Sequence, residues 1–123
     1  MIIQQWETSV LLGGGDFSIG KYTSIGEDLL AITGNHNYEG EKIPFDEKWI
    51  DKGVEIGEYC WLGARVTLLP GTKIGEGAII QAGAVVHGII PPYSIAGGNP
   101  AKVFKYRDKE HFLKLKEEKK FYS

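Results

Sequence analysis

The chain has 123 residues, of which 17 are glycine, and its 14 basic and 16 acidic residues give a formal net charge of −2. This length allows one domain, and the glycines form neither a collagen triplet nor a low-complexity run. The charge balance provides no broad basic surface and no apolar stretch is long enough to cross a bilayer, so we expect neither a nucleic-acid partner nor membrane insertion. The first residues, Met1–Gln5, lack the basic and apolar segments of a secretion signal, which favours a cytoplasmic protein.

The strongest pattern in the chain is an aliphatic residue or alanine at every sixth position. Its members are Ile19, Ile25 and Ala31 and, after one interruption, Ile56, Leu62, Leu68, Ile74, Ile80 and Val86. This period fits neither the turn of an α-helix nor the alternation of a strand, so it describes a repeating unit of one short strand and one tight turn. Three such units close one coil with three flat sides, and stacked coils form a triangular prism with a parallel sheet on each face.

Residues of two further types recur with the same six-residue period. A glycine follows the aliphatic residue in Ile19-Gly20, Ile25-Gly26, Ile56-Gly57, Leu62-Gly63 and Ile74-Gly75. We expect the chain to turn at these glycines with a positive φ, which glycine tolerates without a Cβ clash. Four residues after the aliphatic position stands a small or β-branched residue that fits beside a corner, namely Thr23, Cys60, Val66, Thr72, Ala78 or Ala84. We therefore interpret Cys60, the single cysteine, as a packing residue and not as a nucleophile.

The repeat is interrupted once, between Ala31 and Ile56, by an excursion that we place at residues 35–52. A solenoid accommodates insertions at its corners, and long structured loops in compact domains are commonly functional. The segment combines a histidine, several carboxylates and three large aromatic residues, which favours a binding surface. The alternative is a surface loop whose aromatic side chains only pack back on the prism.

Beyond the last repeat, Pro91-Pro92 and Gly97-Gly98 end the regular coils, and the sequence from about Asp108 to Phe121 favours a helix. Phe112 and Leu115 provide only a narrow apolar stripe on it. Such a helix is not stable alone in water, so we expect it to dock on the prism or on a neighbouring subunit. Its lysines and glutamates, and His111, are most simply a solvated face.

Three stretches of the chain, Ile56–Ala64, Leu69–Ala78 and Pro91–Val103, resemble the hexapeptide-repeat acyltransferases. The spacing is most similar to that of the galactoside, maltose and capsule sugar O-acetyltransferases and of the xenobiotic acetyltransferases. This resemblance implies an all-β fold, a left-handed parallel β-helix over residues 1–107, followed by a short helical tail over residues 108–123. It also implies a homotrimer that binds acetyl-CoA in the cleft between adjacent prisms.

In that family a histidine in a Gly-x-His context, before the protruding loop, acts as the general base. Gly34-Asn35-His36 matches this context, so the resemblance implies that His36 is catalytic. The chemistry is suitable, because an imidazole titrates near neutral pH and can accept the proton of a hydroxyl that attacks a thioester. The alternative for His36 is a loop histidine bonded to nearby backbone.

The resemblance also implies cofactor contacts. The family positions along the pantetheine arm are matched by Trp61, Ala64, Ala82 and Gly83, and the basic positions that meet the nucleotide phosphates by Lys102 and Lys105, with Arg107 behind them. At His87-Gly88 the family has threonine followed by lysine, so His87 is a candidate substitute donor. A metal site needs histidines that converge from neighbouring coils, and the spacing of His36, His87 and His111 does not provide this, so we expect no metal.

For the acceptor, the excursion offers Asn35, Tyr38, Phe45 and Trp49, whose polar and aromatic groups suit a sugar face or a flat antibiotic. The resulting hypothesis is an acetyl-CoA-dependent O-acetyltransferase that acts on a hydroxyl of a sugar or surface-glycan precursor. Two alternatives stay open at this point. One is a xenobiotic O-acetyltransferase that modifies an antibiotic, and the other is a non-catalytic β-helix trimer.

Overall fold

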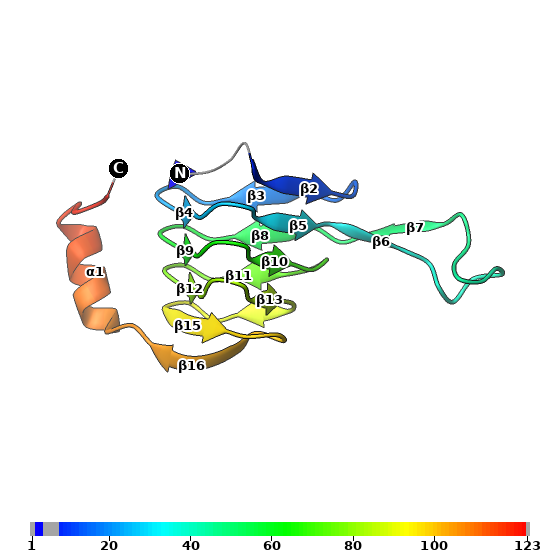
Figure 1. Ribbon diagram of the computed structural model, residues 1–123. Coiled ribbons are helices and arrows are strands. Elements are labelled where there is room, and N and C mark those ends of the chain that lie inside the picture. Colours follow the sequence, from blue (N-terminus) through cyan, green and yellow to red (C-terminus); the bar gives the residue numbers. More distant parts are fainter. Residues whose placement is uncertain (1, 4–7, 123) are drawn as a thin grey trace.

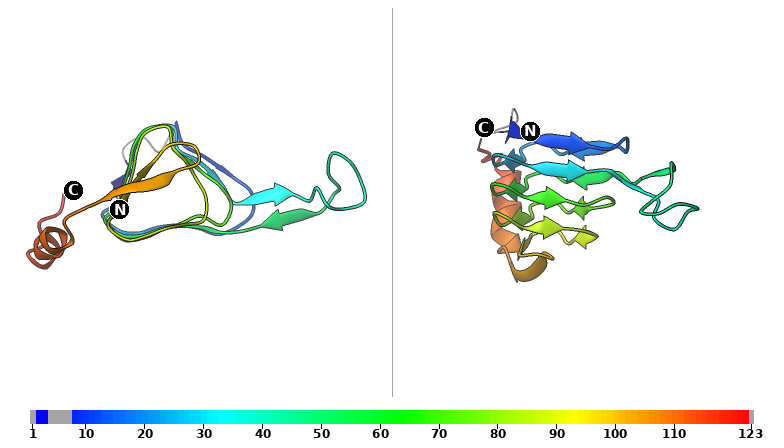
Figure 2. Two further views of the ribbon diagram at one scale, coloured as in Figure 1. Left: turned by 90° about the horizontal axis from the view of Figure 1, so that it is seen from below. Right: turned by 45° about the vertical axis from the view of Figure 1, so that its right-hand side comes forward.

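The computed structural model describes residues 2–3 and 8–122, so the Met1–Gln5 stretch considered above is described only at its second and third residues. Short parallel strands form the three faces of a triangular prism (Figures 1 and 2). Face A contains β1 (Ile2–Ile3), β4 (Ser24–Ile25), β9 (Trp61–Leu62), β12 (Ile79–Ile80), β15 (Ser94–Gly97) and, antiparallel at its edge, β16 (Lys102–Tyr106). Face B contains β2 (Val10–Leu12), β5 (Leu30–Ile32), β10 (Thr67–Leu68) and β13 (Val85–Val86). Face C contains β3 (Phe17–Ile19), β8 (Val54–Ile56), β11 (Lys73–Ile74) and β14 (Ile89–Ile90).

The chain visits the faces in the order C, A, B, and this order defines three corners of the prism. The helix corner joins face C to face A through residues 20–23, 57–60, 75–78 and 91–93. The small-residue corner joins face A to face B through residues 26–29, 63–66 and 81–84. The arm corner joins face B to face C through residues 13–16, 33–53, 69–72 and 87–88.

The core of the prism consists of the six-residue repeat, as predicted. The aliphatic positions are buried from Ile25 onward, and so are the small residues four positions after them. Buried hydroxyl groups bond to the backbone of the next coil, as Thr23 Oγ1 does to the carbonyl oxygen of Gly57 at 2.7 Å. Every buried polar atom of the described side chains has a hydrogen-bond partner. Burial of the threonines therefore leaves no unpaired hydroxyl group that would destabilise the fold.

The glycines that follow the aliphatic residues have a different purpose from the one predicted, and the expected positive φ at these positions is wrong. Positive φ occurs three residues after the aliphatic position, at Tyr22, Asp28, Tyr59, Arg65, Gly71, Gly77 and Gly83. A Cβ at Gly20 would lie 2.4 Å from the backbone nitrogen of Glu58, and one at Gly63 would lie 2.8 Å from that of Ala82. Real side chains do not make contacts this short, so glycine allows neighbouring coils to stack at hydrogen-bonding distance.

The excursion leaves the prism at the arm corner as a two-stranded antiparallel ribbon of β6 (Gly34–His36) and β7 (Trp49–Asp51). We call residues 34–51 the arm. It projects away from the prism on the side opposite the C-terminal helix (Figures 1 and 2). The prediction of an insertion at a corner is therefore confirmed, and its two ends are paired strands that continue the corner outward.

The C-terminal helix α1 (Lys109–Glu117) begins after the N-cap residue Asp108, whose Oδ1 accepts a hydrogen bond from the backbone nitrogen of His111 at 3.1 Å. It ends at Glu117 and not near Phe121, because Lys119 adopts a φ of 55° and Lys120 N bonds back to the carbonyl oxygen of Leu115. The helix docks on the prism at the helix corner, where the Phe112 ring contacts Tyr59 and Tyr93.

Candidate functional site

His36 lies on β6 of the arm, opposite Trp49 of β7, and is exposed to solvent on one side. Its imidazole ring stacks on the Phe45 ring, with 3.7 Å between the centroids and 10° between the planes. The Trp49 ring meets it at a centroid distance of 4.9 Å and an angle of 87°. Two aromatic surfaces at right angles therefore restrict the rotation of the imidazole ring.

The Trp49 ring is itself fixed at the root of the arm. Its Nε1 donates a hydrogen bond to Oδ1 of Asp51, and the same oxygen accepts from the backbone nitrogen of Gly14 at 3.2 Å. Gly34 lies directly against these groups, and a Cβ there would reach within 2.4 Å of both Asp51 Oδ1 and Trp49 Nε1. A contact chain thus runs from the prism through Asp51 and Trp49 to His36. Asp51 is not among the site residues predicted from the sequence, although its alternation with Trp49 along one strand places both side chains on one side of the ribbon.

Beside His36 lies a hollow of about 610 Å³. Among the residues proposed to bind the acceptor, Asn35 and Tyr38 line this hollow, and Phe45 and Trp49 do not. The other lining residues are Asn37, Glu39, Ile50, Lys52 and Pro70. The structure therefore brings Asn35 and Tyr38 to the space next to the imidazole and turns Phe45 and Trp49 toward the imidazole itself.

The outer part of the arm is held by one carboxylate. Asp46 accepts hydrogen bonds from the Asn37 side chain at 3.2 and 3.3 Å and from the backbone nitrogens of Glu41 and Lys48 at 3.3 and 2.9 Å. These bonds, the one from Lys48 first, hold the pKa of Asp46 below its ordinary value. The charged carboxylate closes the arm into a defined loop, which keeps Phe45 next to His36.

The residues expected to contact the cofactor lie on face A and at the small-residue corner. Trp61 stands outward on β9, in register with Ser24 of β4 and Ile79 of β12. Ala64 and Ala82 occupy equivalent positions of successive coils, and the backbone nitrogen of Gly83, the residue after Ala82, bonds to the carbonyl oxygen of Ala64 at 2.9 Å. The exposed Ala82 and Gly83 leave open space beside this corner, since a Cβ at Gly83 would meet no atom within 4 Å.

The remaining candidate residues lie apart from Ala64, Ala82 and Gly83. Lys102 and Lys105 are exposed on β16, where Lys105 pairs with Ile95 of face A and Lys102 with Gly97. His87 lies at the arm corner, between β13 and β14, where the coil is shortened so that Ile90 takes the inward position. Within one chain, His36 and His87 share one corner, and Ala64, Ala82 and Gly83 share another. We call Ala64, Ala82 and Gly83 the small-residue strip. A single prism therefore does not bring His36, the candidate base, next to this strip.

Cys60 lies at the helix corner and is buried. Its Sγ donates to the carbonyl oxygen of Gly75 at 3.1 Å, and burial raises the pKa of the thiol to about 11. A thiol in this state is protonated near neutral pH and packs as a small apolar group, which agrees with its interpretation from the sequence. Within the part of the chain that the structure describes, no three His, Cys, Asp or Glu side chains are placed to hold a metal ion, and no helix is long and apolar enough to span a membrane.

Known protein sequences are similar to this chain in the region of the six-residue repeat. The sequence model of the bacterial transferase hexapeptide family, which describes six repeats, matches residues 53–88. A probable acetyltransferase of Mycobacterium tuberculosis is 39% identical over 93 residues, which are 75% of this chain and 31% of that protein. WbbJ of Escherichia coli, named as a candidate O-acetyl transferase of lipopolysaccharide biosynthesis, is 36% identical over 96 residues, 72% of this chain and 49% of WbbJ.

Solved structures share the same fold. A hexapeptide-repeat acetyltransferase of Vibrio cholerae, complexed with acetyl-CoA, superposes with a TM-score of 0.75 and 27% identity over 82% of this chain and 55% of its own. A galactoside acetyltransferase in complex with coenzyme A has a TM-score of 0.73 and 24% identity over 84% of this chain and 52% of its own, which supports the fold alone.

The chain belongs to the hexapeptide-repeat acyltransferase family, and its prism is the left-handed parallel β-helix of that family. The resemblance to the hexapeptide-repeat acetyltransferases, predicted from three short stretches, is confirmed. The chain spans about half or less of the length of the curated relatives described here.

The buried state of Cys60 makes a direct prediction for its reactivity. We expect a disulfide exchange reagent at about pH 8 to leave the folded chain unmodified and to modify it once the chain is unfolded in denaturant, because the folded thiol is protonated and covered. Absorbance of the released thiolate measures the reaction, and Cys60→Ala provides the blank. Rapid modification of the folded chain would contradict the packing role.

Proposed function

We propose that this protein is an acetyl-CoA-dependent O-acetyltransferase that transfers an acetyl group to a hydroxyl of a sugar or surface-glycan precursor. The observation that carries the proposal is the arrangement of His36, whose ring is held by Phe45 and Trp49 next to an open hollow, in a chain of this family. The relatives named above as acetyltransferases support the type of reaction, and the name of WbbJ supports a glycan as the acceptor.

In the proposed reaction His36 acts as a general base. Its free imidazole nitrogen accepts the proton of the acceptor hydroxyl while the hydroxyl oxygen forms a bond to the carbonyl carbon of the thioester. The carbon–sulfur bond then breaks, and the same proton passes from the imidazole to the departing thiolate. The products are an acetyl ester and a free thiol, and no covalent enzyme intermediate is required. Cys60 takes no part, since it is buried at another corner of the prism.

The cofactor is proposed to run along the small-residue corner and the outer side of face A, with Trp61, Ala64, Ala82 and Gly83 along its arm and Lys102 and Lys105 toward its phosphates. His87 lies at the arm corner with His36, so its proposed cofactor contact comes from that side of the cleft. Asn35 and Tyr38 are proposed to contact the acceptor in the hollow beside His36.

A second copy of the chain completes this site. His36 and the small-residue strip occupy different corners of one prism, so we propose a homotrimer in which the arm of one subunit faces the small-residue corner of the next. The arm reaches outward from the prism and carries exposed apolar side chains, including Ile43, Trp49 and Ile50, which supports contact with another subunit. Cytoplasmic residence is part of the same proposal, and a single unpaired cysteine fits a reducing compartment.

Removal of the proposed base should abolish most turnover without loss of cofactor binding. We expect His36→Ala to lower kcat by about 10²–10⁴-fold, the usual contribution of general base catalysis. Thiol release from acetyl-CoA with a panel of sugars, chloramphenicol and a streptogramin measures turnover and also selects the acceptor class. Calorimetry measures cofactor binding.

His111→Ala is the matched control for this experiment, because His111 is exposed on α1 and its backbone, not its ring, bonds to Asp108. Undiminished turnover in His36→Ala would reject His36 as the base. Turnover of an antibiotic alone would replace the glycan acceptor with a xenobiotic one. Absence of both thiol release and cofactor binding in the unmodified chain would point to a non-catalytic trimer.

The stacked rings predict that Phe45 positions the base and does not bind the acceptor. We expect Phe45→Ala to lower kcat by up to about 10²-fold, because small misplacement of a catalytic group costs this much, and to leave the KM of both substrates nearly unchanged. Phe45→Tyr keeps the stacking surface and should restore most of the rate. Glu41→Ala, on the same arm and exposed, is the control. A raised acceptor KM with an unchanged kcat would instead make Phe45 an acceptor contact.

A further inference from the structure

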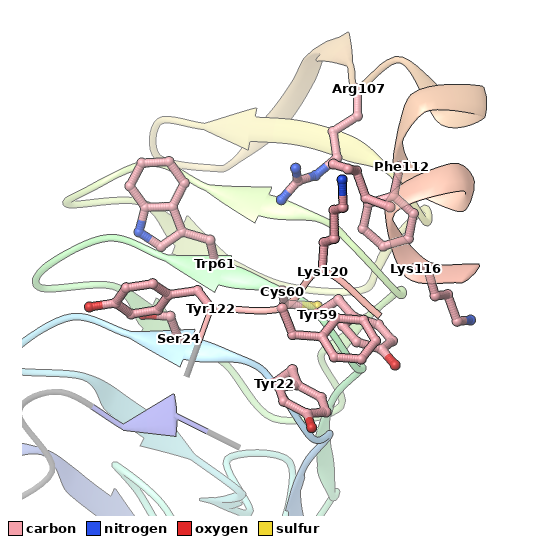
Figure 3. A pocket seen from close by; sticks show the side chains of 12 residues that line it. Tyr22, Ser24, Tyr59, Cys60, Trp61, Arg107, Phe112, Lys116, Lys120 and Tyr122 are labelled. Carbon is pink, nitrogen blue, oxygen red and sulfur yellow. The ribbon is translucent and has the colours of Figure 1, made fainter. Parts of the chain in front are cut away.

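A second hollow, of about 490 Å³, lies at the helix corner between the prism and the C-terminal segment (Figure 3). We call it the helix-side pocket. It is lined by residues of face A and of the helix corner, together with Arg107, residues of α1 and the residues that follow α1. Neither His36 at the arm corner nor Ala64 and Gly83 at the small-residue corner contributes to it. Its volume is within the range of small-molecule sites.

The walls of the helix-side pocket are largely aromatic. Tyr22 and Tyr59 lie parallel with 5.7 Å between their centroids, and Phe121 covers both at 4.4 and 5.2 Å. Trp61 and Tyr122, which are both exposed, stand across the opening from these rings (Figure 3). Facing aromatic surfaces with open space between them suit a flat apolar body, which would bury these exposed rings.

The polar group of the pocket is the guanidinium of Arg107. Its Nε donates a hydrogen bond to the carbonyl oxygen of Gly77 at 2.6 Å, and its Cζ lies 5.4 Å from the centroid of the Phe112 ring. The terminal nitrogens of the guanidinium point into the pocket toward Trp61 (Figure 3). The side chain is partly buried, and this burial lowers the pKa of Arg107. The planar end of a guanidinium can bind both oxygens of a carboxylate at once.

The charges around Arg107 leave this guanidinium without a counter-ion. The other two cationic side chains of the pocket have acidic partners, Lys116 with Glu76 at 2.5 Å and Lys120 with Glu118 at 3.3 Å. Over residues 8–122, the ion pairs of the structure include none that joins a carboxylate to Arg107. A partly desolvated charge is stabilised when an anion pairs with it, so the pocket has an apolar wall and one unmatched cation.

We propose that the helix-side pocket binds a small aromatic carboxylic acid, whose ring lies between the aromatic walls and whose carboxylate pairs with Arg107. The pocket shares Trp61 with the proposed path of the cofactor but contains neither His36 nor the small residues of the small-residue corner, so the proposal does not depend on acetyl transfer. Binding here would fasten the C-terminal segment to the prism, because the ligand would contact Trp61 of the prism and the residues after α1 at the same time.

Calorimetric titration of the whole chain with 2-naphthoate tests the proposal, with 2-naphthylmethanol as the uncharged probe of similar shape. We expect 2-naphthoate to bind, and both the loss of its charge and the substitution Arg107→Gln to weaken binding roughly tenfold or more, as expected for a hydrogen bond between charged groups. Lys114→Gln is the matched control, because it removes a positive charge from an exposed position of α1 outside the pocket.

Tyr122→Ala provides a second variant that leaves the Arg107–Gly77 bond in place. Tyr122 is exposed, and its loss should weaken naphthoate binding through the aromatic wall while thermal unfolding by circular dichroism stays unchanged. Equal affinity for the acid and the alcohol, or unchanged affinity in folded Arg107→Gln, would overturn the proposal. Competitive displacement of naphthoate by acetyl-CoA would also overturn it, because the pocket would then be part of the cofactor site.

Discussion

Close stacking of the coils is the constraint on which the rest of the structure depends. Backbone nitrogens of one coil donate to carbonyl oxygens of the next at 2.7–3.1 Å, for example from Gly20 to Ile56 and from Gly57 to Ile74. At this separation a side chain on Gly20 or Gly63 would collide with the neighbouring backbone. The inward aliphatic residue and the glycine after it therefore act together, one to fill the interior and the other to let the coils approach.

This constraint also decides where function can be located. A coil that must stay in register with its neighbours accepts extra residues only at a corner, and the arm arises at such a corner. Because the arm leaves the prism, the imidazole of His36 cannot rely on the core for its orientation. The rings of Phe45 and Trp49 provide this support instead, and Asp51 connects Trp49 to Gly14 of the prism.

Much of the fold could be predicted from the sequence, because one period determines the spacing and the burial of the strands in the coils. The antiparallel strands β6, β7 and β16 lie outside this period. The same residues, Ile56 through Val86, proved to be the core. The role of the glycines was not accessible in this way, since a close approach between Gly63 and Ala82 depends on how two coils stack. The end of α1 at Glu117 depends on the left-handed Lys119, which no residue type at that position indicates. For the candidate site, His36 was selected because Gly34-Asn35-His36 resembles the family context, and its catalytic role stays a prediction. The stacking of Phe45 on His36 depends on how residues 37–48 fold back.

The central claim is that the site forms between two copies of the chain, and complementation of two inactive variants tests it most directly. One variant is His36→Ala, and the other is Ala82→Trp, which fills the small-residue strip; the two are expressed together with different tags and purified as mixed trimers. The account predicts that each variant alone is nearly inactive and that the purified mixed trimers show roughly a third of the wild-type thiol release, because one of the three interfaces in each mixed trimer combines an intact His36 with an intact strip. Mixed trimers with no restored activity would contradict it, because both groups would then have to act within the same chain.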